Sequence, residues 1–164
     1  KIDCIITSPP YLQAQEYIRT FKMEMRWSGI SNEKIKEYSG KEIPFRLAEG
    51  RIEGDYINKI RSKLKKRSLI NMFDSYFWFT IKSLERASDR LNKNGKVCIL
   101  IGNPKMEGIE VEIWKVIYEY FIKNLNYKPI EVFEDRIVSR KLFKGRNNLN
   151  PEGMKSEYLI VLEK

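Results

Sequence analysis

Apolar residues occur along this chain in two alternating patterns. Short continuous apolar runs predict β-strands, whereas stretches with an apolar residue every three or four positions predict amphipathic helices. The runs are residues 2–7, 96–101, 129–134 and 157–162, and the helical stretches are residues 13–27, 72–91 and 110–125. Strands that alternate with helices predict an α/β fold with a mostly parallel sheet, and the last two strands predict an antiparallel C-terminal edge strand.

The first run is too continuously apolar for a solvated strand, so we expect residues 2–7 to form a buried strand that ends at Pro9 and Pro10. Residues 28–70 differ from the rest, because glycine, proline and charged residues interrupt the apolar pattern. They predict a surface insertion in a single domain of residues 1–164. Within the insertion, residues 56–69 predict a basic helix.

The charge balance favours a polyanionic partner. The chain carries 31 Lys and Arg against 22 Asp and Glu, a net charge of +9, which suits nucleic acid or an anionic membrane surface. Surface ion pairs of a thermophilic protein would explain the same composition equally well. No apolar stretch approaches the roughly 20 residues that span a bilayer, so we expect a soluble protein without a membrane partner.

The chain contains no histidine, which argues against zinc hydrolases, Ser-His triads and Cys-His nucleophiles and predicts no metal site. Cys4 and Cys98 stand inside apolar runs, where a thiol usually acts as a small hydrophobe. Free thiols favour a reducing, cytoplasmic setting.

The residues that carry chemistry follow the first strand. Ser8-Pro9-Pro10-Tyr11 stands at its carboxyl end, which is where open α/β sheets bind ligands. An ordinary loop or a proline-rich ligand of a partner domain is the alternative. With the preceding strand, the tetrad resembles the catalytic motif of S-adenosylmethionine-dependent DNA amino-methyltransferases. The serine form is most frequent in cytosine-N4 enzymes and an aspartate form in adenine-N6 enzymes.

The resemblance implies a role for each residue of the tetrad. Ser8 and the carbonyl of Pro9 would accept hydrogen bonds from the exocyclic amino group, which localises a lone pair otherwise delocalised into the ring. Two prolines fix the loop at low entropic cost, and Tyr11 would stack on a base swung out of the duplex. Thr7 and Ser8 would contact the cofactor, S-adenosylmethionine.

The resemblance continues along the chain and implies part of a Rossmann-like methyltransferase sheet. Further agreeing positions are Tyr17, Phe21, Trp27, Gly29, the turn Leu91 to Gly95, Ile101-Gly102-Asn103, Arg136, Arg140 and Met154 to Tyr158. The glycine-rich turn that binds the cofactor in this family is missing, because no Gly-x-Gly occurs in the sequence. We therefore expect the cofactor-binding half on an upstream domain or a second chain, or to have been lost.

Two basic groups are candidate DNA contacts, and a solvated surface is an equal alternative for both. They are Lys63, Lys65, Lys66 and Arg67 in the insertion, and Arg136 and Arg140 before the last strand. The insertion is the only sizeable place for target recognition. Asn103 is expected to form a turn before proline or to touch a ligand, and Trp27, Trp78 and Trp114 are expected in the core.

The sequence leaves functions of two classes open. The first is an enzyme that methylates cytosine N4, or less readily adenine N6, in DNA, as in restriction-modification systems; an amino-methyltransferase acting on RNA is a variant. The second is a non-catalytic DNA-binding or interaction subunit of a split or degenerate methyltransferase.

Overall fold

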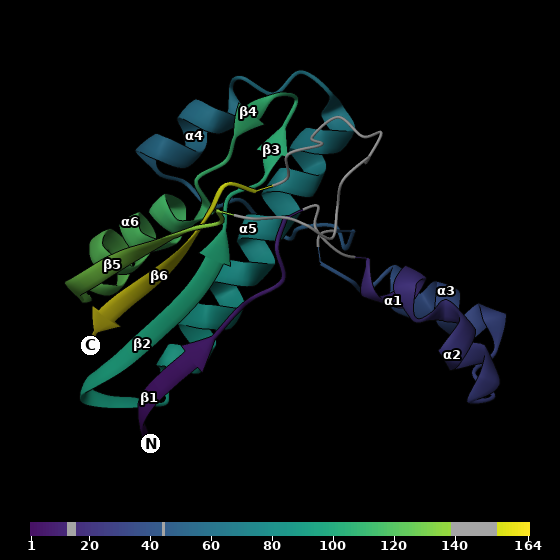
Figure 1. Ribbon diagram of the computed structural model, residues 1–164, viewed down its shortest axis with the longest axis horizontal. Coiled ribbons are helices and arrows are strands. Elements are labelled where there is room, and N and C mark those ends of the chain that lie inside the picture. Colours follow the sequence, from purple (N-terminus) through teal and green to yellow (C-terminus); the bar gives the residue numbers. More distant parts are fainter. Residues whose placement is uncertain (13–15, 44, 139–153) are drawn as a thin grey trace.

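The computed structural model describes residues 1–12, 16–43, 45–138 and 154–164 (Figure 1). Arg140, a predicted DNA contact, lies outside the described residues. The fold is α/β, as the sequence predicted, and a mixed sheet forms its centre. Among the described residues, no helix is long and apolar enough to cross a membrane.

Four strands form the main sheet, in the order β1-β2-β6-β5. β1 and β2 are parallel, and β6 is antiparallel to both of its neighbours, β2 and β5. Their bounds are Ile2–Thr7 for β1, Leu91–Gly102 for β2, Lys128–Arg136 for β5 and Ser156–Glu163 for β6. This arrangement is compatible with a Rossmann-like methyltransferase sheet.

The C-terminal strand is antiparallel as predicted, but it lies inside the sheet and not at its edge. β6 separates β2 from β5, so β5 is the edge strand among those described. The burial of β6 agrees with this place, because Ile160 and Leu162 are fully buried, whereas β5 is largely exposed.

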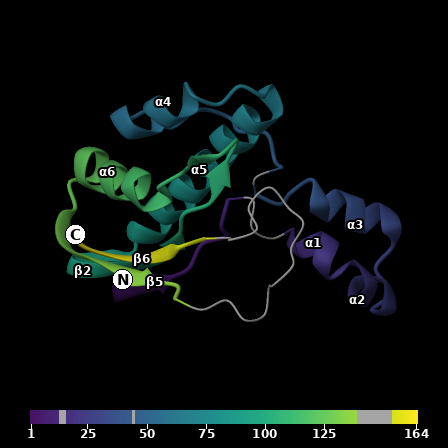
Figure 2. The same cartoon turned by 45° about the horizontal axis from the view of Figure 1, so that its top comes forward.

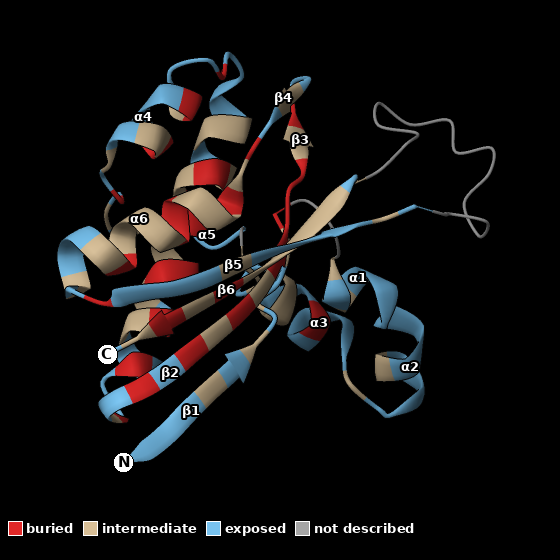
Figure 3. Ribbon diagram, turned by 60° about the vertical axis from the view of Figure 1, so that its left-hand side comes forward, coloured by how far each residue is buried: buried red, intermediate tan, exposed pale blue. Residues whose placement is uncertain are grey.

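Two helices cover one face of the sheet (Figures 1 and 3). α5 spans Arg67–Ser88 and α6 spans Ile113–Leu125, close to the predicted helices 72–91 and 110–125. Their apolar faces pack against the inward residues of β2 and β6 in one core. Its largest fully buried side chains include Phe73, Tyr76, Phe77, Ile81, Ile99, Ile101, Ile117, Phe121 and Ile160.

The opposite face of the sheet is open among the described residues. Ile6 pairs with Cys98, which pairs with Val161, so these side chains share that face. Ile6 is 80% exposed and Phe133, on the same face of β5, is 54% exposed. The prediction that the first strand is buried is therefore wrong for this chain. Its sequence suits a strand covered on both faces, and one cover is absent from the described residues.

Residues 17–61 form four short helices. α1 spans Tyr17–Thr20, α2 Lys22–Trp27, α3 Asn32–Ser39 and α4 Asp55–Arg61. The first three form a helical arm that stands away from the sheet (Figures 1 and 2). The predicted helix 13–27 is thus divided into two, and Gly29 adopts a positive φ of 81° after it, as a helix stop requires.

Two further sequence predictions for this region need correction. The predicted basic helix 56–69 is interrupted at residues 62–66, where Leu64 turns into the core and α4 gives way to α5. Trp27 is 81% exposed on the arm, so it is not a core residue, whereas Trp78 and Trp114 pack against the core as predicted. A two-stranded hairpin of β3 (Lys105–Met106) and β4 (Ile109–Glu110) follows β2 and was not predicted.

Candidate functional site

The predicted catalytic loop follows β1 directly and lies beside the end of β2. Because the two strands are parallel, Ser8 to Tyr11 and Gly102 lie at the carboxyl ends of neighbouring strands, at the same end of the sheet. The ring of Tyr11 packs against Gly102, where an added Cβ would lie only 3.1 Å from Tyr11 Cε2 and would also meet Met154. Ser8 and Pro10 are exposed, Pro9 is half-buried, and the loop is accessible to a ligand.

A buried tyrosine of α5 forms a hydrogen bond with this loop. The phenol of Tyr76 donates a 2.8 Å hydrogen bond to the Pro10 carbonyl, and the Tyr76 side chain is completely buried. Burial raises the pKa of Tyr76 well above its ordinary value, so the phenol stays protonated and remains a donor. Among the described residues, no donor binds the carbonyl of Pro9, which is left to accept from a ligand.

The phenol of Tyr11 is fixed by a residue of β6. It donates a 2.9 Å hydrogen bond to Oε1 of Glu157, which lies opposite Gly102 in the β2–β6 register. Burial raises the pKa of Tyr11, hydrogen bonding to Ser8 opposes this rise, and the interaction with Glu157 adds to it. The phenol therefore stays neutral at pH 7 and anchors the ring.

Sequence reasoning missed Tyr76 and the role of Glu157. Glu157 belongs to the segment Met154 to Tyr158 on which the family resemblance partly rests, but nothing in that segment connects it to Tyr11. Tyr76 stands among the apolar residues of α5, where its spacing indicates only a core position. Both contacts depend on how distant segments meet, because Tyr76 stands 66 positions after Pro10 and Glu157 stands 146 positions after Tyr11.

Thr7 and Ser8 are the predicted contacts of S-adenosylmethionine. Thr7 and Ser8 lie at the end of β1, the outer edge of the described sheet, with no described strand beyond it. The walls of two cavities, one between α4 and α6 and one among α1, α2 and α3, include neither residue.

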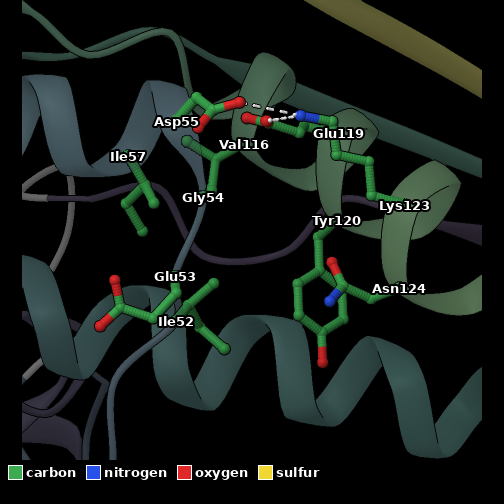
Figure 4. A pocket seen from close by; sticks show the side chains of 10 residues that line it. All are labelled: Ile52, Glu53, Gly54, Asp55, Ile57, Val116, Glu119, Tyr120, Lys123 and Asn124. Atoms are coloured by element: carbon green, nitrogen blue, oxygen red, sulfur yellow. Dashed lines mark hydrogen bonds and ion pairs between the residues drawn. The ribbon is translucent and has the colours of Figure 1, made fainter.

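One such cavity, of about 270 Å³, lies between α4 and α6 (Figure 4). The ammonium of Lys123 bridges the carboxylates of Asp55 and Glu119 on its rim, at 3.0 and 2.6 Å. The pair with Asp55 joins the insertion to α6, whereas the pair with Glu119 lies within α6. The cavity shares no lining residue with the predicted catalytic loop.

Asn103 follows Gly102 and is buried. Its Nδ2 donates to Glu110 at 3.4 Å, whereas its Oδ1 has no hydrogen-bond partner among the described residues. Asn103 therefore lies in the connection between β2 and β3, and the turn of this region is at residues 107–108 and not at Asn103 as predicted.

The predicted DNA contacts that the structure describes lie toward the same end of the sheet as the loop. Arg136 ends β5, which runs in the same direction as β1 and β2, and its side chain is 80% exposed. Lys63, Lys65 and Lys66 precede α5, and Arg67 is its first residue. The backbone N–H of Lys65 donates to Glu107 of the β3–β4 turn at 2.7 Å, so this segment is anchored while its side chains face solvent.

Comparison with known proteins identifies relatives. The chain is 29% identical over 136 residues to the Type II methyltransferase M.AvaI of Nostoc sp. and of Anabaena variabilis. It is 26% identical over 129 residues to the Type II methyltransferase M.BsoBI of Geobacillus stearothermophilus. These alignments cover 82% and 73% of this chain.

The chain spans about a quarter of the length of these relatives, 26% and 24%. No protein-family model matches it. The sequence similarity, together with an α/β sheet that carries Ser8 to Tyr11 at the carboxyl end of a strand, makes this chain a distant relative of Type II DNA methyltransferases.

Proposed function

We propose that this chain is the base-handling half of a DNA methyltransferase that transfers a methyl group from S-adenosylmethionine to an exocyclic amino group, most favourably cytosine N4. The observation that carries the proposal is the geometry of the loop. The Pro10 carbonyl is held by Tyr76 and the Tyr11 phenol by Glu157. The exposed Ser8 hydroxyl, whose hydrogen bond to the phenol lowers the pKa of Tyr11, keeps lone pairs that can accept, and no described donor binds the Pro9 carbonyl.

The loop acts on the base by hydrogen bonding and stacking. An amino group of cytosine has two hydrogens, and two acceptors, the Ser8 hydroxyl and the Pro9 carbonyl, would bind them. This makes the nitrogen more tetrahedral and directs its lone pair away from the loop. The Tyr11 ring gives the swung-out base an aromatic face, a contact worth roughly 1–3 kcal/mol per base.

S-adenosylmethionine supplies an electrophilic methyl group, and the missing cofactor site needs a second portion of protein. We place this portion against β1 and the open face of the sheet. β1 presents an unpaired edge, which is a template for another strand. The exposed side chains of Ile6 and Phe133 give the open face an apolar surface that a helical layer would bury.

A methylation assay tests the proposed function. The gene product that carries this chain is incubated with S-adenosylmethionine bearing a labelled methyl group and with duplex DNA, and the DNA is digested to nucleosides. We expect label in N4-methylcytosine. Label in N6-methyladenine would correct the target base, and label that enters only RNA would correct the substrate.

A non-catalytic subunit is the second candidate function, and a sequence without a Gly-x-Gly turn favours it. Calorimetric titration with S-adenosylmethionine separates the two. Binding that appears only when the cofactor-binding portion is present supports the enzyme. DNA binding without cofactor binding or methyl transfer in any combination supports the non-catalytic subunit.

A further inference from the structure

The helical arm of α1, α2 and α3 contains a groove of about 440 Å³. Its floor includes Ile35, which is buried, and its walls come from all three helices. Four of the lining side chains are cationic, and one is anionic. The cations are Arg19, Lys22, Arg26 and Lys36, and the anion is Glu16.

The two arginines are fixed by neighbours within the arm. Arg19 pairs with Glu16 at 3.1 Å, and Nε of Arg26 donates to Oδ1 of Asn32 at 2.9 Å, which links α2 to the start of α3. Lys22 and Lys36 have no ion-pair partner in the part of the chain that the structure describes. Two lysines on different helices, Lys22 on α2 and Lys36 on α3, therefore line the groove without a carboxylate partner among the described residues, which suits an anionic ligand.

An apolar surface borders these cations on α2. Lys22 and Arg26 are four positions apart and share one face of the helix, and Met23 and Trp27 share the adjacent face. Met23 is 57% exposed and Trp27 is 81% exposed. Exposed aromatic residues beside phosphate-binding cations are typical of nucleic-acid surfaces, because the ring contacts bases or sugars while the cations bind the backbone.

The arm is within reach of DNA bound at the catalytic loop. Tyr17, the first residue of α1, stands six positions after Tyr11, so these positions are at most about 22 Å apart. One turn of B-DNA is roughly 34 Å long. After the arm in sequence, the guanidinium of Arg46 lies 4.6 Å from the centre of the Phe79 ring on α5. The segment that follows the arm is thus in contact with α5.

We infer that the helical arm is a DNA-contacting element, in which the groove binds the phosphate backbone and Trp27 contacts the adjacent nucleotides. The inference rests on the proposed function for the choice of DNA as the polyanion. No residue of the arm is among the predicted contacts at residues 63–67 and 136. The inference extends the expected recognition region, residues 28–70, to α1 and α2, which precede it.

Salt-dependent DNA binding tests the inference without any need for methyl transfer. Affinity of the gene product for a fluorescent duplex is measured by anisotropy across a range of salt concentrations. In Lys22→Gln/Lys36→Gln, two phosphate contacts are lost, which should lower the slope of log affinity against log salt by about 2 and weaken binding roughly 10- to 50-fold near 0.1 M salt. These lysines make no ion pair in the described structure, so the arm should keep its fold.

A matched variant controls for net charge. Lys34→Gln/Lys93→Gln removes the same charge from an exposed position of α3 outside the groove and from the distant start of β2, and it should bind almost like the wild type. Trp27→Ala should weaken binding with little change in slope, because it removes no charge.

The outcomes separate this inference from the proposed function. Three results would overturn the inference. They are an equal loss of DNA affinity in the two double-lysine variants, an unchanged salt slope in Lys22→Gln/Lys36→Gln, and no binding of the wild type to duplex DNA. If Lys22→Gln/Lys36→Gln binds as the wild type does while methyl transfer to DNA is intact, the inference fails and the proposed function stands. If binding falls as expected but no methyl is transferred, the proposed function fails and the arm is still a DNA contact.

Discussion

The phenol of Tyr76 and the carbonyl of Pro10 form a 2.8 Å hydrogen bond that joins α5 to the loop after β1. The donor is fully buried and held in the core, whereas the acceptor belongs to an exposed residue. A rigid helix therefore fixes the position of a loop whose other groups meet the ligand.

Tyr76→Phe should impair methyl transfer more than it impairs folding. Loss of one hydrogen bond lowers the free energy of unfolding by about 1 kcal/mol, and a loop that is no longer held should lower kcat by roughly tenfold. Denaturant unfolding and steady-state kinetics measure the two effects. Tyr127→Phe is the matched control, because Tyr127 is also buried and donates to a backbone carbonyl, that of Ser88, away from the site. Equal kcat losses in the two variants would count against a positioning role for Tyr76.

Gly102→Ala should displace the ring of Tyr11. The added methyl group would overlap the end of the Met154 side chain, which must move, and would lie 3.1 Å from Tyr11 Cε2, so the ring must also shift by a few tenths of an ångström. We expect methyl transfer to fall several-fold with a smaller loss of stability. Gly40→Ala is the control, since its nearest neighbour would be 3.6 Å away at an ordinary helical φ of −70°. Wild-type transfer by Gly102→Ala would show that the ring position is not critical.

Thiol labelling tests whether the open sheet face is a docking surface. The sequence has two cysteines, and Cys4 is exposed on that face, whereas burial and the neighbouring Cys4 raise the pKa of Cys98. In this chain we expect Cys4 to react with a thiol reagent faster than Cys98. The cofactor-binding portion, when present, should protect both. An unchanged Cys4 labelling rate would mean that this face is not covered.

Alkaline pH should destabilise the contact between the insertion and α6. Burial raises the pKa of Tyr56 to about 12, and its phenol donates to Oε2 of Glu112 at 3.1 Å. Tyr56 ionises near pH 10 in the unfolded chain and near pH 12 in the folded chain. Its stabilisation of the fold is therefore complete below pH 10 and is lost progressively between pH 10 and 12. Urea unfolding at pH 9 and 11 should show a larger loss for the wild type than for Tyr56→Phe. Identical losses would contradict the assignment.

The sequence predicted where helices and strands occur better than it predicted their burial and their neighbours in the sheet. Strands 129–134 and 157–162 and helix 110–125 match β5, β6 and α6 because local periodicity encodes them. Burial of β1 and the place of β6 depend on which segments lie beside them, and no local pattern carries that information. The apolar run of residues 2–7 suits a strand that is covered on both faces, and one of these covers is absent from the described residues.

In the candidate site, too, residues that are contiguous in sequence could be predicted, and residues that meet only in the folded chain could not. The tetrad at residues 8–11 could be found from sequence because it is contiguous. Tyr76 and Glu157 could not, because their relation to the loop exists only after α5 and β6 have packed. Trp27 was assigned to the core because aromatic residues are usually buried, and its exposure on the arm is the exception on which the inferred DNA contact partly rests.

The central claim is that the loop Ser8 to Tyr11 handles the base during methyl transfer. Its most direct test is the rate of label transfer from S-adenosylmethionine to duplex DNA by the gene product that carries this chain, with Tyr11→Ala and Pro9→Ala beside the wild type. We predict that Tyr11→Ala lowers the rate by about 5- to 150-fold, the equivalent of a lost stacking contact, and that Pro9→Ala lowers it less by loosening the loop. Wild-type rates in both variants would contradict the account.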